Sequence, residues 1–74
     1  MKRLGEVAQV AAGRLIVRCT DEEPPALGSM AVDADLETVG RVVDVFGPVR
    51  RPYVTLSPSD DPDPTRLGQR LYVR

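Results

Sequence analysis

Hydrophobic residues occur along the chain in short, valine-rich runs that Gly, Pro and Asp interrupt at a spacing of roughly ten residues. Runs of this kind are typical of an all-β domain with many turns, and helix signals are scarce. The pattern predicts six strands with loosely placed ends: Leu4–Val10, Arg14–Cys19, Gly28–Asp33, Glu37–Phe46, Tyr53–Ser57 and Gln69–Val73. Between the first two, Ala11-Ala12-Gly13 predicts a short hairpin loop in which glycine takes a positive φ.

The fourth predicted strand carries apolar residues on both of its faces. Strict alternation would place Val39, Arg41, Val43 and Val45 on one face and Gly40, Val42, Asp44 and Phe46 on the other. Such a strand is buried on both sides, or it faces a core on one side and a partner on the other.

Six short strands with seven prolines would leave exposed edges if the sheet stayed open, so we expect a closed six-stranded barrel. An open sandwich is the alternative. The 74 residues are expected to form one domain, 1–74, and we see no internal repeat. The loop 58–66, rich in Asp and Pro, is predicted to be too polar to pack and to be mobile.

A domain this small usually needs disulfides, a structural metal or a partner. The chain has one cysteine, Cys19, and no histidine, so one copy offers neither a disulfide nor a Cys/His zinc site. Cys19 is interpreted as a small core or rim residue of a strand, because a catalytic thiol would need an activating base. We therefore expect association with a partner, and no metal, cofactor or catalytic residue.

The formal net charge is -1 and the sequence pI is about 5.2, which argues against a strong positive field and against direct nucleic-acid binding. No apolar run approaches the roughly 20 residues that cross a membrane, and no signal-peptide core follows the N-terminus. The sequence predicts a soluble, cytoplasmic protein.

The stretch from Asp44 to Tyr53 is the most unusual part of the chain. Gly47 permits a backbone angle that other residues resist, while Pro48 and Pro52 each fix φ and remove an amide donor. A loop stiffened in this way loses little entropy on binding. It would present four side chains at one end of the barrel as a docking surface: Val45, Phe46, Val49 and Tyr53.

A plainer interpretation of the same stretch stays open from the residues alone. Phe46 could be the largest core residue, Gly47-Pro48 a turn, and Pro52 the terminator of an edge strand. Arg50 and Arg51 would then be solvated loop charges, or else an ionic rim or a phosphate contact. Asp44 would accept hydrogen bonds from turn amides.

The run Gly40-Arg41-Val42-Val43-Asp44-Val45-Phe46-Gly47-Pro48-Val49-Arg50-Arg51-Pro52-Tyr53-Val54 closely resembles the glycine-arginine-rich protein family, the small barrel subunit of H/ACA ribonucleoproteins, in its compact archaeal form. Similarity in order and spacing extends to Met1–Gly5, Leu15–Arg18, Gly28–Asp33 and Gly68–Val73, and so covers nearly the whole chain. The Asp-Val-Phe-Gly-Pro-Val…Pro-Tyr-Val segment is the specific part.

The resemblance implies a barrel like those of translation factors, without catalytic chemistry, which docks on the catalytic domain of an RNA-guided pseudouridine synthase. It implies a role in substrate loading and product release during rRNA modification, with guide RNA reached only indirectly through the complex. Carried over by position, the contact set is Val45, Phe46, Gly47, Pro48, Val49, Pro52 and Tyr53.

The chain departs from eukaryotic members of that family because it carries no Gly-Arg-rich tail, which puts an RNA-binding role of its own in doubt. The related assembly factor of the same complexes shares this type of barrel, and the absence of its usual long flanking regions favours the mature subunit. The alternative function is a stand-alone small barrel that binds RNA or ribosomal components directly. An enzymatic function has little support, since neither a glycine-rich phosphate loop nor a nucleophile with a base is visible.

Overall fold

A computed structural model describes residues 2–59 and 62–74 of the chain. It contains six strands and one short 3-10 helix: β1 (Lys2–Ala11), β2 (Arg14–Cys19), β3 (Met30–Val32), β4 (Thr38–Phe46), β5 (Tyr53–Ser57), η1 (Pro64–Arg66) and β6 (Arg70–Val73). The ends predicted for β2 and β5 are confirmed to the residue. Within the described part of the chain, no helix is long and apolar enough to cross a membrane.

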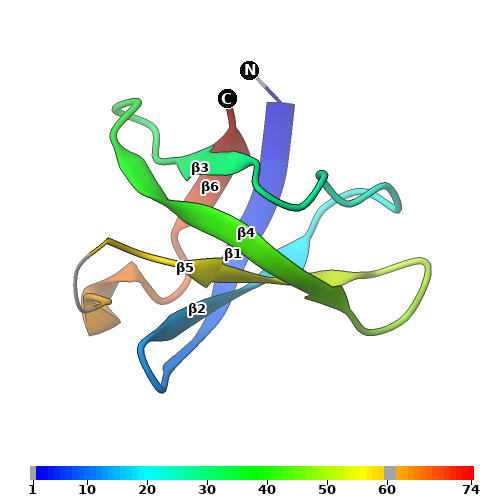
Figure 1. The fold of residues 1–74 in the computed structure, drawn as a ribbon, viewed down its shortest axis with the longest axis horizontal. Coiled ribbons are helices and arrows are strands. Elements are labelled where there is room, and N and C mark those ends of the chain that lie inside the picture. The colour runs from blue at the N-terminus through cyan, green and yellow to red at the C-terminus, as the bar shows by residue number, and fades with distance from the viewer. Residues whose placement is uncertain (1, 60–61) are drawn as a thin grey trace.

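The six strands form a closed barrel in the order β1-β2-β5-β4-β3-β6, and every neighbouring pair is antiparallel (Figure 1). Closure depends on β6, which pairs with β1 on one side and with β3 on the other. Because Lys2 lies opposite Val73, the two ends of the described chain are side by side. The predicted fold class, a closed all-β barrel, is confirmed, and the open sandwich is excluded.

The barrel encloses one core of aliphatic side chains, which strand alternation directs inward. Its buried hydrophobic members are Leu4, Val7, Leu15, Val17, Cys19, Ala31, Val32, Val39, Val42, Val54, Leu56 and Leu71. Fully burying an aliphatic side chain of this size contributes about 1.5–3 kcal/mol relative to leaving it exposed. Cys19 is a free, buried thiol in this set, which confirms its interpretation as a strand-core residue.

The hairpin between β1 and β2 is tighter than predicted. Ala11 already pairs with Arg14, so only Ala12 and Gly13 form the turn, with φ angles of 53° and 74°. Two positive φ angles define the turn type that matches the twist of hairpin strands. Glycine supplies one of these angles as expected, and Ala12 adopts the other.

The prediction of strict alternation along β4 is wrong. Val39 and Val42 are both buried, Val45 is half-buried, and Val43 and Phe46 are exposed. The cause is two shifts of register: one against β3, where Gly40 and Thr38 pair with consecutive residues, and one against β5 between Val42 and Asp44. A β-bulge inserts one unpaired residue and so moves every later side chain to the opposite face.

The third strand is shorter than predicted because its first residues pair without forming a regular strand. The Gly28 amide donates to the Val42 carbonyl, and the Val42 amide donates to the Ser29 carbonyl, at 2.8 and 2.9 Å. At the other end, Asp33 leaves β3 to enter the β3–β4 turn. β4 and β6 each begin one residue later than expected, and β1 extends beyond both predicted ends.

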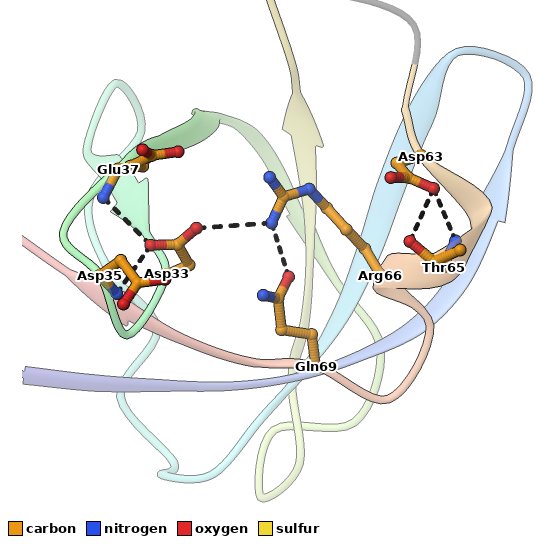
Figure 2. A network of polar contacts seen from close by, with 7 residues as sticks. All are labelled: Asp33, Asp35, Glu37, Asp63, Thr65, Arg66 and Gln69. Atoms are coloured by element: carbon orange, nitrogen blue, oxygen red, sulfur yellow. Dashed lines mark hydrogen bonds and ion pairs between the residues drawn. The ribbon is translucent and has the colours of Figure 1, made fainter.

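Polar side chains join the β3–β4 turn to the connection between β5 and β6 (Figure 2). The buried Asp33 accepts hydrogen bonds at Oδ1 from the amides of Asp35 and Glu37, at 2.9 and 3.1 Å. Its Oδ2 lies 3.8 Å from Arg66 Nη1, which also donates to Gln69 Oε1 at 2.6 Å. We call Asp33, Arg66 and Gln69 the polar clasp.

In the second half of the loop 58–66, which was predicted to be too polar to pack, residues 63–65 are exposed and Arg66 is half-buried. Asp63 Oδ1 accepts hydrogen bonds from the Thr65 amide and hydroxyl and so caps η1 (Figure 2). These donors, assisted by Arg66, hold the pKa of Asp63 below its ordinary value. Residues 60–61 lie outside the described part of the chain.

Candidate functional site

The loop between β4 and β5, residues Gly47–Pro52, lies within the stretch that was predicted to form a docking surface. The loop begins and ends on an aromatic pair, because Phe46 and Tyr53 lie directly opposite each other at the ends of their strands. Their rings stack with centroids 5.6 Å apart and an interplanar angle of 18°. Stacked rings at this separation stabilise each other, so the base of the loop is held by side chains as well as by the ladder.

Within the loop the backbone forms a tight turn. The Arg51 amide donates to the Pro48 carbonyl at 3.2 Å, so Val49 and Arg50 occupy the two central positions. Pro48 fixes the φ angle that leads into this turn. Val49 therefore stands at the tip with 86% of its surface exposed, the highest value among the large exposed hydrophobic residues of the described chain.

The end of the loop is fastened to the neighbouring strand. The carbonyl of the buried Pro52 accepts a hydrogen bond from the Cys19 amide at 2.9 Å, which continues the pairing of β2 with β5 by one step. At the start of the loop Gly47 has φ +92°, and a Cβ added there would lie 2.9 Å from Tyr53 Cδ1. Glycine is thus required both for the backbone angle and for the position of the tyrosine ring.

The predicted contact residues divide into outward-facing and inward-facing groups. Exposed residues are Phe46, Gly47, Pro48 and Val49; Tyr53 is half-buried. Val45 packs against the core and Pro52 is buried. The alternative interpretation of Phe46 as a core residue is wrong, since 44% of its surface is exposed. Four of the seven predicted residues are therefore exposed, Tyr53 is partly exposed, and Val45 and Pro52 face inward.

The polar residues of the stretch are placed as follows. Arg50 and Arg51 are exposed loop residues. Asp44 Oδ1 accepts a hydrogen bond at 2.9 Å from the amide of Val45, its neighbour in β4, and not from the turn amides that were predicted. The carboxylate thereby satisfies a backbone donor near the end of β4.

Two features of this region were missed by sequence reasoning. Val43 is 43% exposed, because the bulge turns it outward, and nothing in the local sequence marks the bulge. The second is a depression that Arg51 lines together with three arginines from the strands: Arg3, Arg18 and Arg70. Each of those three is an outward residue of a strand, but only the strand order shows that they converge.

Cys19, the single thiol of the chain, is not activated as a nucleophile. Burial raises the pKa of Cys19, and the nearby charge of Asp21 raises it further. A raised pKa keeps the thiol protonated at neutral pH, and it is the thiolate that reacts. Among the described residues, no group of three or more Cys, Asp or Glu side chains is placed to hold a metal ion.

The geometry defines a small closed barrel that carries a rigid, apolar-tipped loop at one end. A family model described as the Gar1/Naf1 RNA binding region matches residues 1–74, and the chain belongs to the Gar1 family. A protein of Methanothermobacter thermautotrophicus named only as uncharacterized is 37% identical over 78 residues, covering 99% of this chain and 83% of the relative.

A more distant relative carries a functional name. The H/ACA ribonucleoprotein complex subunit GAR1 of Encephalitozoon cuniculi is 25% identical over 69 residues, and the match covers 93% of this chain but only 38% of that protein. The chain thus matches well under half the length of that relative. Among solved structures, the Gar1 domain of Naf1 superposes with a TM-score of 0.81 at 20% identity, over 97% of this chain and 82% of that domain, which shows the shared fold.

Proposed function

We propose that this protein is a non-catalytic subunit of an H/ACA ribonucleoprotein, which docks through its β4–β5 loop on the pseudouridine synthase and promotes substrate loading and release. The observation that carries the proposal is the exposed apolar tip, Val49 beside Phe46, on a loop whose two ends are fixed. Family membership and the name of the Encephalitozoon relative support the assembly.

The loop suits protein docking for energetic reasons. An exposed valine and an exposed phenylalanine gain free energy when a partner removes them from water. Since the turn at Pro48 and the Pro52–Cys19 hydrogen bond already order the backbone, little conformational entropy is lost in the complex. The stacked Phe46–Tyr53 pair provides the aromatic centre that interface hot spots usually contain.

Binding to the synthase in the absence of RNA tests the docking surface. We expect the wild-type chain to co-elute with the synthase, and Phe46→Ala or Val49→Asp to weaken the complex about 30-fold or more, the size of effect expected at a hot spot. Leu27→Asp is the matched control, because Leu27 is an exposed apolar residue of the β2–β3 connection, 65% exposed. Folded Phe46 and Val49 variants that bind like Leu27→Asp would refute the loop as the docking surface.

Turnover tests the regulatory part separately. Multiple-turnover pseudouridylation by the synthase complex should be faster with this chain than without it. A single turnover started from preloaded substrate should change less, because it requires neither loading nor release. An unchanged multiple-turnover rate, with binding intact, would remove the regulatory role and leave only a structural one.

A further inference from the structure

The depression beside the docking loop concentrates positive charge on a chain whose net charge is -1. Its volume is about 330 Å³, and four of the chain's nine arginines line it: Arg3, Arg18, Arg51 and Arg70. We call these four residues and the surface between them the arginine basin. Glu6 is the one carboxylate in its lining.

Strand register explains how the basin forms. Glu6 on β1 lies opposite Arg18 on β2 and opposite Arg70 on β6, so the three form one row across the barrel. Their neighbours Val7, Val17 and Leu71 are buried, and alternation therefore turns all three outward. Neighbouring strands lie about 4.8 Å apart, which puts the Cα atoms of Arg18 and Arg70 roughly 10 Å apart.

The remaining two arginines enter from different segments. Arg3 precedes Glu6 on β1, and Arg51 comes from the β4–β5 loop, which the Cys19–Pro52 hydrogen bond holds against the end of β2. Gly5 lies in the lining between them, and a Cβ added there would be only 1.9 Å from the carbonyl oxygen of Arg18. Glycine thus permits the close approach of β1 and β2 that brings these side chains together.

Within the described part of the chain, the guanidinium groups of the basin form no ion pair and donate no hydrogen bond. Residues 2–59 and 62–74 contain one ion pair, Arg66–Asp33, and the three arginine side chains that donate hydrogen bonds are Arg14, Arg66 and Arg74. Like charges around one depression repel each other, and Glu6 offsets only one of the four arginine charges. Asp21 and Glu23 lie around a neighbouring cavity that shares Arg3, and they bound the positive surface on that side.

We propose that the arginine basin binds the phosphate groups of a single-stranded RNA. Each guanidinium presents five N–H donors in a planar fork that fits phosphate oxygens. Charges supplied by four separate segments suit a ligand with repeating negative groups better than a single carboxylate. Tyr53 lies opposite Arg18 on β5, so the row continues from arginine to a half-buried aromatic ring, the combination that single-strand binders use for phosphate and base.

RNA binding in the arginine basin runs against the expectation drawn from net charge, and it does not require docking on the synthase. The net charge of the whole chain sets the electrostatic potential far from its surface. A phosphate in the basin would instead lie close to four arginines and one glutamate. Arg51 is the one member of the basin that belongs to the β4–β5 loop. Docking and RNA contact can therefore fail independently.

The test measures the anisotropy of a short fluorescein-labelled oligouridylate titrated with the full chain over a series of KCl concentrations. Wild type should bind, with an affinity that falls linearly on log–log axes as salt rises. The double variant Arg18→Gln/Arg70→Gln should bind about tenfold more weakly or worse, and its salt slope should be shallower by about 0.7 for each phosphate that an arginine no longer neutralises. Arg51→Gln, which changes no strand residue, should show a smaller loss in the same direction.

The matched control is Arg14→Gln/Arg41→Gln, which removes two charges from exposed positions outside the basin. It should keep the wild-type slope; equal weakening of both double variants would make the binding a net-charge effect and overturn the site. No RNA binding by wild type, or arginine-dependent binding of polyglutamate in its place, would overturn RNA as the ligand. Val49→Ala, which truncates the tip of the β4–β5 loop outside the basin, should leave RNA binding within about twofold, which separates this result from the docking test.

Discussion

The β4–β5 loop and the connection that carries η1 lie at opposite ends of the long axis of the barrel (Figure 1), and they treat polarity in opposite ways. The first holds apolar Val49 in solvent, whereas the second brings Arg66 to the buried Asp33 (Figure 2). In both regions, backbone hydrogen bonds and specific partners determine whether a side chain is exposed. The hydrophobicity of the individual residue does not determine it.

The two regions also contribute to different properties, stability and binding. The contacts of the polar clasp are made within the chain, so its contribution is already realised in the folded protein. The tip of the β4–β5 loop leaves its apolar surface unused, and that free energy becomes available when a partner covers it. We therefore expect changes in the clasp to lower stability, and changes at the tip to lower binding.

The largest expected effect comes from Asp33→Ala, which should lower the free energy of unfolding by about 2–3 kcal/mol and the Tm by about 10 °C or more. The substitution removes the acceptor of two backbone amides and the carboxylate partner of Arg66. Thermal and urea unfolding measure the change. Asp35→Ala is the control, because Asp35 is exposed in the same turn and should shift stability by less than about 0.5 kcal/mol. Equal losses in the two variants would show that the clasp does not stabilise the barrel.

Gly47→Ala should cost about 1–2 kcal/mol and should disturb the aromatic pair. Alanine at φ +92° is strained, and its Cβ would approach Tyr53 Cδ1 at 2.9 Å. Gly13 has a similar backbone angle, φ +74°, but a Cβ added there meets nothing within 4 Å. Gly13→Ala therefore measures the cost of backbone strain alone. Urea unfolding gives both energies, and ring chemical shifts of Phe46 and Tyr53 report the stacking. If Gly13→Ala costs as much and the ring shifts of Gly47→Ala stay unchanged, the ring contact contributes nothing.

The smallest expected effect is acid loosening of the η1 cap. The pKa of Asp63 is lowered by hydrogen bonds from Thr65, so its contribution is present above the ordinary aspartate range and is lost as pH falls through the lowered value, below about pH 4. Because Asp63 is fully exposed, the change should be local. The Thr65 amide shift followed by NMR should report it, and Thr65→Val should raise the midpoint by removing the hydroxyl donor. A midpoint that Thr65→Val leaves unchanged would contradict this assignment.

The location of the β4–β5 loop and most of the strands could be predicted because their signals are local. A short apolar run between two arginines marks β2, and alternation marks β5. Gly47 with two prolines marks a rigid turn. The face presented by Val43 and Phe46 could not be predicted, because it depends on a bulge that forms against β5. The packing of Arg66 was missed for a related reason, since its partner Asp33 lies on another connection.

What the sequence determined by itself is the class of fold, the turn at Gly47–Pro52 and the residues available at its tip, because propensity and side-chain period act between near neighbours in the chain. The tertiary structure alone decided which side chains meet: the order in which β6 closes the barrel, the inward position of Pro52, and the convergence of four arginines beside Glu6. Those outcomes depend on the register between strands distant in sequence, which local patterns do not encode.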